Sequence, residues 1–202
     1  MLNSRENILL TALRLFSQNG YEAVSISDIA GALGLSKGAM YRHFKNKRDL
    51  FNQILLRMEA QDAERAAQFS LPVNSLEGNE AEYRGASVAQ VIAFSRAQLR
   101  YWLEDEFAAP FRRMLSLEQY RSEEMRALHA NYLVFGPLGY TEDLLASLGY
   151  DAPREKALAF YAPMFFLYSL YDAGEPLPRV LALADEHFDR AARALIGDEA
   201  KK

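Results

Sequence analysis

The chain has 202 residues, of which half are hydrophobic and 12% aromatic, so it can bury the core of one large domain or of a small and a large one. It contains no cysteine, which excludes disulfides, thiolate zinc sites and cysteine nucleophiles and fits a cytoplasmic location. The net charge of −4 is uneven, because residues 1–50 hold seven Lys/Arg against four Asp/Glu and the remainder holds sixteen against twenty-three. A locally basic surface binds DNA even in an acidic protein, although a chance fluctuation would give the same counts.

Membrane insertion and secretion are not expected. The longest apolar stretch, residues 157–168, is far shorter than a membrane-spanning helix and contains Pro163. The first six residues lack a charged region followed by an apolar one, which a signal peptide requires.

Hydrophobic periodicity predicts an all-α chain of nine or ten helices, without a credible strand. The first helix is expected over residues 4–18 and ends at Asn19-Gly20, since glycine tolerates a left-handed helix terminus. Ser25 and Asp28 form a capping pair for a second helix, and Gly34 makes a tight turn. The next two helices are expected to begin at the caps Ser36 and Asn46 and to cover about 37–44 and 47–67.

The remainder of the chain reads as a loop followed by more helices. Residues 71–85 are polar and interrupted by Pro72 and Gly78, which predicts a loop whose order is left open. Helices are then expected over residues 88–103, 110–119, 122–133, 141–148 and 153–173, with a last one from after Pro178 to about Ile196.

The segment with the clearest chemistry is residues 25–47, which reads as two short helices joined by a tight turn. Such a turn also occurs in proteins that never touch DNA, so the DNA-binding prediction depends on the residues that follow. No acid occurs between Lys37 and Arg48, whereas five basic residues do: Lys37, Arg42, Lys45, Lys47 and Arg48. Small residues at the start of the third helix allow close approach to bases, and nearby hydroxyl and imidazole groups suit phosphate oxygens: Gly38, Ala39, Tyr41 and His43.

Residues 8–54 resemble the N-terminal DNA-binding domain of the TetR (TetR/AcrR) family of bacterial transcriptional regulators. The matching features are Ala12, Phe16, Gly20-Tyr21, Ile29-Ala30, the run from Leu33 to Phe44, Lys47 and Leu50-Phe51. Beyond about fifty residues the chain agrees with the family only in length and helical character. The resemblance implies a helix-turn-helix DNA-binding domain over 1–48. It also implies a ligand-binding and dimerisation domain over 49–202, entered through a linking helix at about 47–67.

The resemblance also implies roles for single residues. Ser25 and Ser27 would contact the phosphate backbone, while Lys37, Ala39 and Arg42 would face base edges. Arg42 would read a guanine directly or, alternatively, contact the backbone. Tyr41, His43 and Lys47 would bind phosphates, although Tyr41 could instead pack helix three against helix one. The full predicted DNA-binding set is Ser25, Ser27, Ser36, Lys37, Gly38, Ala39, Tyr41, Arg42, His43 and Lys47.

The C-terminal part offers candidates for an effector pocket and for a dimer interface. Aromatic residues of the middle segment would line the pocket, or simply form core: Phe94, Tyr101, Trp102, Phe107, Phe111, Tyr120, Tyr132 and Phe135. The last two helices of each subunit would form a four-helix dimer interface, or pack only within the chain, through Phe165, Tyr168, Leu181, Ala184, Phe188, Ala191 and Leu195.

We do not expect an enzyme. His43, His129 and His187 lie far apart in the sequence without metal-ligand spacing, and no phosphate loop or nucleophile elbow occurs. No cofactor or metal is predicted. The sequence favours a homodimeric regulator, most simply a repressor, that leaves its double-stranded DNA operator when a small organic effector binds. The alternatives are a helical small-molecule or protein-binding module that no longer binds DNA, and an activator or architectural DNA-binding protein without an effector.

Overall fold

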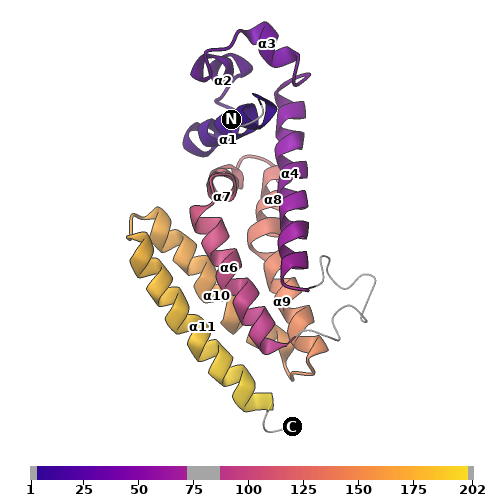
Figure 1. Cartoon of the computed structure of the whole chain (residues 1–202), viewed down its shortest axis with the longest axis vertical. Coiled ribbons are helices and arrows are strands. Elements are labelled where there is room, and N and C mark those ends of the chain that lie inside the picture. Colours follow the sequence, from indigo (N-terminus) through magenta and orange to yellow (C-terminus); the bar gives the residue numbers. More distant parts are fainter. Residues whose placement is uncertain (1–3, 72–86, 200–202) are drawn as a thin grey trace. The chain divides into compact units, whose positions relative to one another are not determined.

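The computed structural model describes residues 4–71 and 87–199, and its regular structure in these ranges is entirely α-helical (Figure 1). The predicted all-α fold is therefore confirmed. The loop predicted over residues 71–85 lies, apart from Leu71, outside the described residues. No helix in the described part is long and apolar enough to cross a membrane.

The first three helices are α1 (Ser4–Asn19), α2 (Ile26–Ala32) and α3 (Lys37–Tyr41). Helix α1 ends as predicted at Gly20, whose φ of +86° is a left-handed conformation that suits glycine. Helix α3 is shorter than predicted, because Arg42 is its C-cap rather than an interior residue. The physical reason is that Lys45 and Asn46 already make the capping hydrogen bonds of the next helix, so the chain must leave α3 before them.

Contacts group the chain into two compact units. Unit 1 comprises the chain up to Asp62 together with Asp105–His129, and unit 2 comprises Ala63–Glu104 and the chain from Ala130 onwards. Helix α4 (Lys47–Gln68) and helix α8 (Glu123–Leu133) contribute residues to both. The predicted boundary between residues 48 and 49 concerns functional domains and remains a prediction.

Unit 1 adds helix α7 (Ala108–Glu118) to the first three helices and the start of α4. Helix α7 packs against α1. Fully buried side chains of this unit come from α1, α2, α4, α7 and the N-cap of α7, and include Ile8, Leu13, Phe16, Ile29, Leu50, Phe51, Ile54, Phe107, Phe111 and Leu115. The small N-terminal helices therefore share one apolar core with α7.

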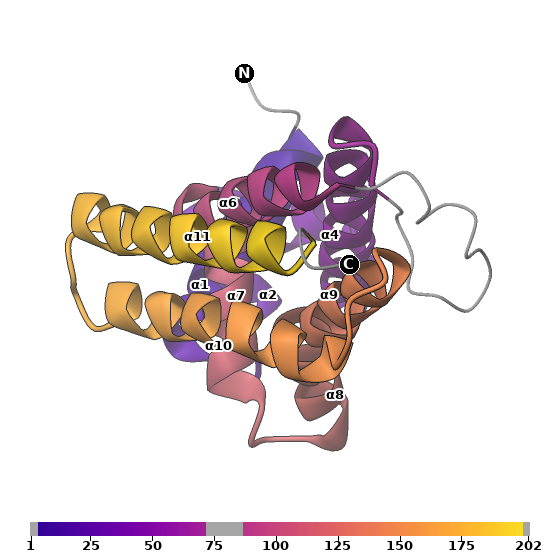
Figure 2. The same ribbon diagram turned by 90° about the horizontal axis from the view of Figure 1, so that it is seen from below.

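Unit 2 contains α6 (Val88–Glu104), α9 (Phe135–Ser147), α10 (Pro153–Asp172) and α11 (Leu177–Glu199). Helix α10 packs against α9 and α11, and α11 also packs against α6 (Figure 2). Buried tyrosines tie these helices together, since the Tyr161 hydroxyl donates to the Leu133 carbonyl at 2.8 Å and the Tyr150 hydroxyl to the Leu195 carbonyl at 3.0 Å. Burial raises the pKa of Tyr161, which keeps its phenol a neutral donor.

Candidate nucleic-acid interface

Helices α2 and α3 are held at a fixed turn by local hydrogen bonds. The Ser25 hydroxyl accepts from the Asp28 N–H at 3.2 Å, and the Asp28 carboxylate accepts from the Ser25 N–H at 2.7 Å, which confirms the predicted capping box. These bonds to Ser25 lower the pKa of the Asp28 carboxyl. Gly34, with φ +65°, makes the turn, and the Ser36 hydroxyl caps α3 by accepting from the Ala39 N–H at 3.1 Å. The turn thus presents α3 in one defined orientation.

Helix α3 has a buried side and a cationic side. Met40 and the following Phe44 are 1% and 2% exposed and anchor the segment in the core of unit 1. Lys37, Arg42 and Lys45 are exposed, and none of them pairs with an acid in the described part of the chain. Three positive side chains are therefore available to an external anion on one short segment.

The aromatic residues predicted to bind phosphates are also accessible. Tyr41 is 48% exposed, so it does not seal α3 against α1, and the Lys37 ammonium lies 6.0 Å from its ring centroid. His43 is exposed and its ring lies beside that of Phe44. Both side chains flank the cations of α3 and present hydrogen-bonding atoms to the same solvent.

The small and hydroxyl residues of the predicted set lie at the helix starts. Ser25, Ser27, Ser36 and Gly38 are exposed, while Ala39 is half-buried. Ser25 and Ser36 use their oxygens as cap acceptors. Because a hydroxyl that accepts one bond still has a proton to donate, capping leaves both serines able to bind a phosphate oxygen.

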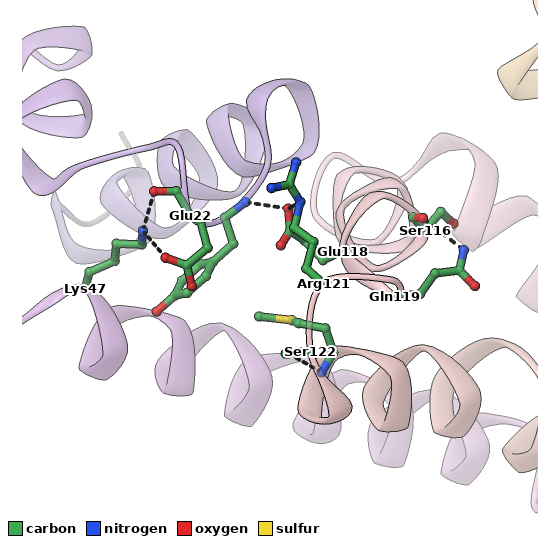
Figure 3. A network of polar contacts seen from close by, with 9 residues as sticks. Glu22, Lys47, Ser116, Glu118, Gln119, Arg121 and Ser122 are labelled. Carbon is green, nitrogen blue, oxygen red and sulfur yellow. Dashed lines mark hydrogen bonds and ion pairs between the residues drawn. The ribbon is translucent and has the colours of Figure 1, made fainter.

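Lys47 differs from the other cations, because unit 1 already surrounds it (Figure 3). Its ammonium donates to the Glu22 carbonyl at 3.2 Å, lies 3.9 Å from the Glu22 carboxylate and sits 4.2 Å from the ring centroid of Tyr21. Burial raises the pKa of Tyr21, with an opposing effect of Arg48, so its ring stays a neutral platform. No sequence pattern indicated this cluster, because Glu22 and Lys47 are 25 residues apart.

Arg48, the last residue of the basic run, is neutralised within unit 1. Its guanidinium forms a two-bond ion pair with Glu124 at the start of α8. The hydrogen bond from Arg48 lowers the pKa of Glu124, and the same bond raises the pKa of Arg48. Arg48 therefore connects α4 to α8, although the sequence analysis counted it among the five basic residues of residues 37–48.

The N-terminal domain can now be assigned. Residues 8–54 match the sequence profile described as "Bacterial regulatory proteins, tetR family". These residues are therefore similar to the DNA-binding domain of TetR-family regulators. The regulator AcrR of Shigella flexneri is 53% identical to this chain over 51 residues, which are 25% of this chain and 24% of AcrR. That match spans about a quarter of the relative's length and confirms the resemblance for the TetR-family domain.

Solved structures extend the likeness to the whole fold. The complex of SmeT with triclosan, SmeT being the repressor of a Stenotrophomonas maltophilia multidrug efflux pump, has a TM-score of 0.65 at 18% identity. The match covers 94% of this chain and 90% of that one. NalD, the secondary repressor of the MexAB-OprM pump in Pseudomonas aeruginosa, has a TM-score of 0.59 at 23% identity and 94% coverage of both chains. The chain thus has the fold of TetR-family regulators, a helix-turn-helix followed by a helical C-terminal domain.

The predicted effector residues do not come together in one unit. Phe107 and Phe111 are fully buried in unit 1, where Tyr120 is 89% exposed. Unit 2 holds the others, of which Phe135 is 66% exposed and the rest are buried or half-buried: Phe94, Tyr101, Trp102 and Tyr132. The surface groove between α1 and α4 contains none of them, being lined by Arg5, Glu6, Leu9, Gln53, Leu56 and Arg57.

Sequence reasoning missed other members of the unit 2 aromatic cluster. Phe94 lies 5.5 Å from Phe69 and 6.1 Å from Tyr140 between ring centroids, and neither partner was predicted. The Arg65 guanidinium lies 4.1 Å from the Tyr101 centroid. No group of three or more His, Asp or Glu that could hold a metal ion occurs among the described residues.

The residues predicted for the dimer interface divide by burial. Tyr168, Ala184, Phe188 and Leu195 are buried within the single chain, Leu181 and Ala191 are half-buried, and Phe165 is 39% exposed. The exposed apolar residues of α10 and α11 form a different set: Leu158, Phe165, Phe166, Leu183 and Ile196. The most regular stripe of α11 therefore packs within the chain, while these other apolar side chains of α10 and α11 remain exposed to solvent.

Proposed function

We propose that this chain is a homodimeric transcriptional regulator that binds double-stranded DNA through α3 and acts as a repressor in the cytoplasm. A small organic effector releases it from its operator. The observation that carries the proposal is the set of exposed cations Lys37, Arg42 and Lys45, which pair with no acid in the described part of the chain. They lie on α3 and the residues that follow it, a segment that Met40 and Phe44 anchor in the core. The printed names of its relatives describe regulators and repressors rather than enzymes.

DNA recognition would place α3, from Lys37 to its C-cap Arg42, in the major groove. Arg42 carries a planar two-donor fork that matches the guanine edge, and such a pair contributes about 1–3 kcal/mol of discrimination. Lys37 and the small Ala39 accompany it at the base edges. Ser25, Ser27, Tyr41, His43 and Lys47 bind phosphates, which fixes the register without reading sequence.

The effector site is proposed in unit 2, around the aromatic cluster of Phe94, Tyr101 and Trp102. Aromatic walls with a few polar tips suit a small organic molecule. SmeT, which shares the fold, has been solved with triclosan. An effector changes DNA affinity only through its different affinity for the bound and released states, typically about 1–3 kcal/mol.

Dimerisation is proposed through the exposed apolar side chains of α10 and α11, which include Leu158, Phe165, Phe166, Leu183 and Ile196. Large exposed apolar residues on two adjacent helices are typical of a contact surface rather than of a monomer's solvent face. A twofold dimer would supply two copies of α3 for one DNA site.

The direct test is a fluorescence-anisotropy titration with the DNA that precedes the chain's own gene, at two salt concentrations. Arg42→Ala should weaken specific binding about 10- to 100-fold and leave non-specific binding nearly unchanged. The control is Arg100→Ala, which removes an exposed arginine of α6 that forms an ion pair with Glu104 on the same helix. This variant should change DNA affinity less than twofold.

Two outcomes would contradict the proposal. If Arg42→Ala binds as tightly as the parent chain, Arg42 does not read the operator. If the parent chain binds no DNA even at low salt while small molecules raise its melting temperature, the alternative of a ligand-binding module without DNA-binding activity is favoured.

A further inference from the structure

Glu118, at the C-terminal end of α7, is an ionisable side chain buried in unit 1. Its side chain is 1% exposed. One carboxylate oxygen, Oε1, accepts from the Tyr21 N–H at 3.1 Å and lies 3.3 Å from Nε of Arg121 (Figure 3). A buried carboxylate is costly unless hydrogen bonds and a cation satisfy it. Through this hydrogen bond to the Tyr21 backbone N–H, Glu118 connects α7 to the segment between α1 and α2.

The absence of a side chain at Gly20 leaves room for the Glu118 carboxylate. Gly20 precedes Tyr21, and a Cβ at this position would lie 2.6 Å from the same Glu118 oxygen, closer than real Cβ atoms come. Its φ of +86° also suits glycine. The backbone of residues 20–21 thus rests directly on Glu118, without an intervening side chain.

Two residues of this backbone segment, Tyr21 and Glu22, contact the ammonium of Lys47. The ring of Tyr21 lies 4.2 Å from the Lys47 ammonium and is wedged between Phe16 at 5.1 Å and Phe51 at 4.9 Å. The next residue, Glu22, offers its carbonyl oxygen to the same ammonium at 3.2 Å. The position of Lys47 is therefore set by the two residues that follow the Glu118 contact.

We propose that Glu118 is a positioning residue for DNA binding, through which α7 fixes the phosphate-binding ammonium of Lys47. The inference rests on the proposed function, because it takes Lys47 as a phosphate ligand. Glu118 itself is buried and does not touch DNA. Without the Glu118 acceptor, Tyr21 and Glu22 lose their fixed position, and the ammonium is no longer held ready for a phosphate.

The test is a double-mutant cycle read out by operator affinity against salt concentration. Glu118→Ala should weaken operator binding about three- to tenfold and lower the slope of log K against log [salt] by about one phosphate contact. Lys47→Ala should lower the slope to the same value as Glu118→Ala does. In the Lys47→Ala background, Glu118→Ala should then cause little further change in operator affinity or slope. In the Lys37→Ala background, which removes a cation not in the cluster, Glu118→Ala should keep its full effect.

The conservative variant separates positioning from charge. Glu118→Gln keeps an oxygen that can accept the Tyr21 N–H, so it should retain the parent slope. If Glu118→Ala acted only by destabilising the fold, it would lower the melting temperature, and any change in the salt slope would be the same with and without Lys47. That result would contradict the positioning role.

Additive effects of Glu118→Ala and Lys47→Ala would overturn the inference. If Glu118→Ala does not fold, Tyr21→Leu replaces it: this variant keeps an apolar side chain but removes the ring beneath the ammonium, and an unchanged slope would again overturn the inference. Absence of any operator binding by the parent chain would instead be a failure of the proposed function.

Discussion

At the scale of single residues, Glu22 stands in an unexpected place for a DNA-binding surface. Its carboxylate is 71% exposed and lies 3.9 Å from the ammonium of Lys47, whose side chain is 21% exposed. A phosphate that approaches Lys47 must compete with this carboxylate and meets its negative charge. Glu22 therefore opposes the binding that its own carbonyl oxygen helps to organise.

Glu22→Gln should strengthen operator binding by about two- to fivefold, the range expected when a solvent-exposed ion pair no longer competes. The carbonyl bond to Lys47 remains, so the ammonium keeps its position. The measurement is anisotropy at low salt. Glu59→Gln, which removes an exposed acid elsewhere on α4, is the control for overall charge and should have a smaller effect. Weaker binding by Glu22→Gln would mean that the carboxylate is needed to place Lys47.

Whether the sequence alone could predict a residue's role depends on how many residues separate it from its partner in the chain. The caps Ser25–Asp28 and Ser36–Ala39 join residues three apart, so the pattern alone was sufficient. Arg48 and Glu124 are 76 residues apart, and Tyr21 and Glu118 are 97 apart. No periodicity or spacing reports such pairs, which is why the sequence grouped Arg48 with the free cations and gave Glu118 no role.

At the scale of elements, the turn between α1 and α2 depends on one glycine for two independent reasons. Gly20 has a left-handed φ, and its missing Cβ leaves room for the Glu118 carboxylate. The N–H of Gly20 also caps α1 by donating to the Phe16 carbonyl at 2.9 Å. The sequence predicted the first reason from the Asn19-Gly20 pair, whereas the second appears only when α7 is in place.

Gly20→Ala should destabilise the chain by more than the roughly 1–2 kcal/mol expected for a left-handed alanine alone, because the new methyl also meets the carboxylate. The measurement is a chemical-denaturation midpoint. In the Glu118→Ala background the steric part should vanish and only the conformational part should remain. Equal costs in the two backgrounds would show that Glu118 moves aside without strain.

The lengths and faces of the helices show a second limit of sequence reasoning. The predicted third helix was too long, because a periodic pattern continues through Phe44 although the cap of α4 begins at Lys45. On α11 the regular stripe of Ala184, Phe188 and Leu195 was predicted for the dimer interface, yet these residues are buried within the chain. Periodicity identifies an apolar face, but it does not say which neighbour covers it.

At the scale of the whole molecule, the two units are joined by more than one stretch of chain. The chain passes between them within α4 after Asp62, again after Glu104, and within α8 after His129. The fourth helix, which the sequence analysis expects to link the two functional domains, is therefore one of several connections. In the proposed effector response, the contacts that bind α7 and α8 into unit 1, at Tyr21–Glu118 and Arg48–Glu124, would offer additional routes for coupling.

Dimerisation supplies the last prediction. Phe166 and Leu158 are 62% and 55% exposed on α10, so placing charge there costs the isolated chain little. Phe166→Glu combined with Leu158→Glu should therefore leave the helical circular dichroism intact but convert the species in sedimentation velocity from two chains to one. Ala146→Glu, on an exposed position of α9, is the matched control and should leave the dimer unchanged.

The same double variant tests why a dimer is needed. Two copies of α3 separated by about one DNA turn, roughly 34–36 Å, bind one site far more tightly than either copy alone. Loss of that linkage should weaken operator affinity by about 10²- to 10⁴-fold, while Arg42 still distinguishes operator from unrelated DNA. A parent chain that sediments as a single chain while it binds operator tightly would refute the twofold arrangement. A variant that stays dimeric would place the interface on another face of unit 2.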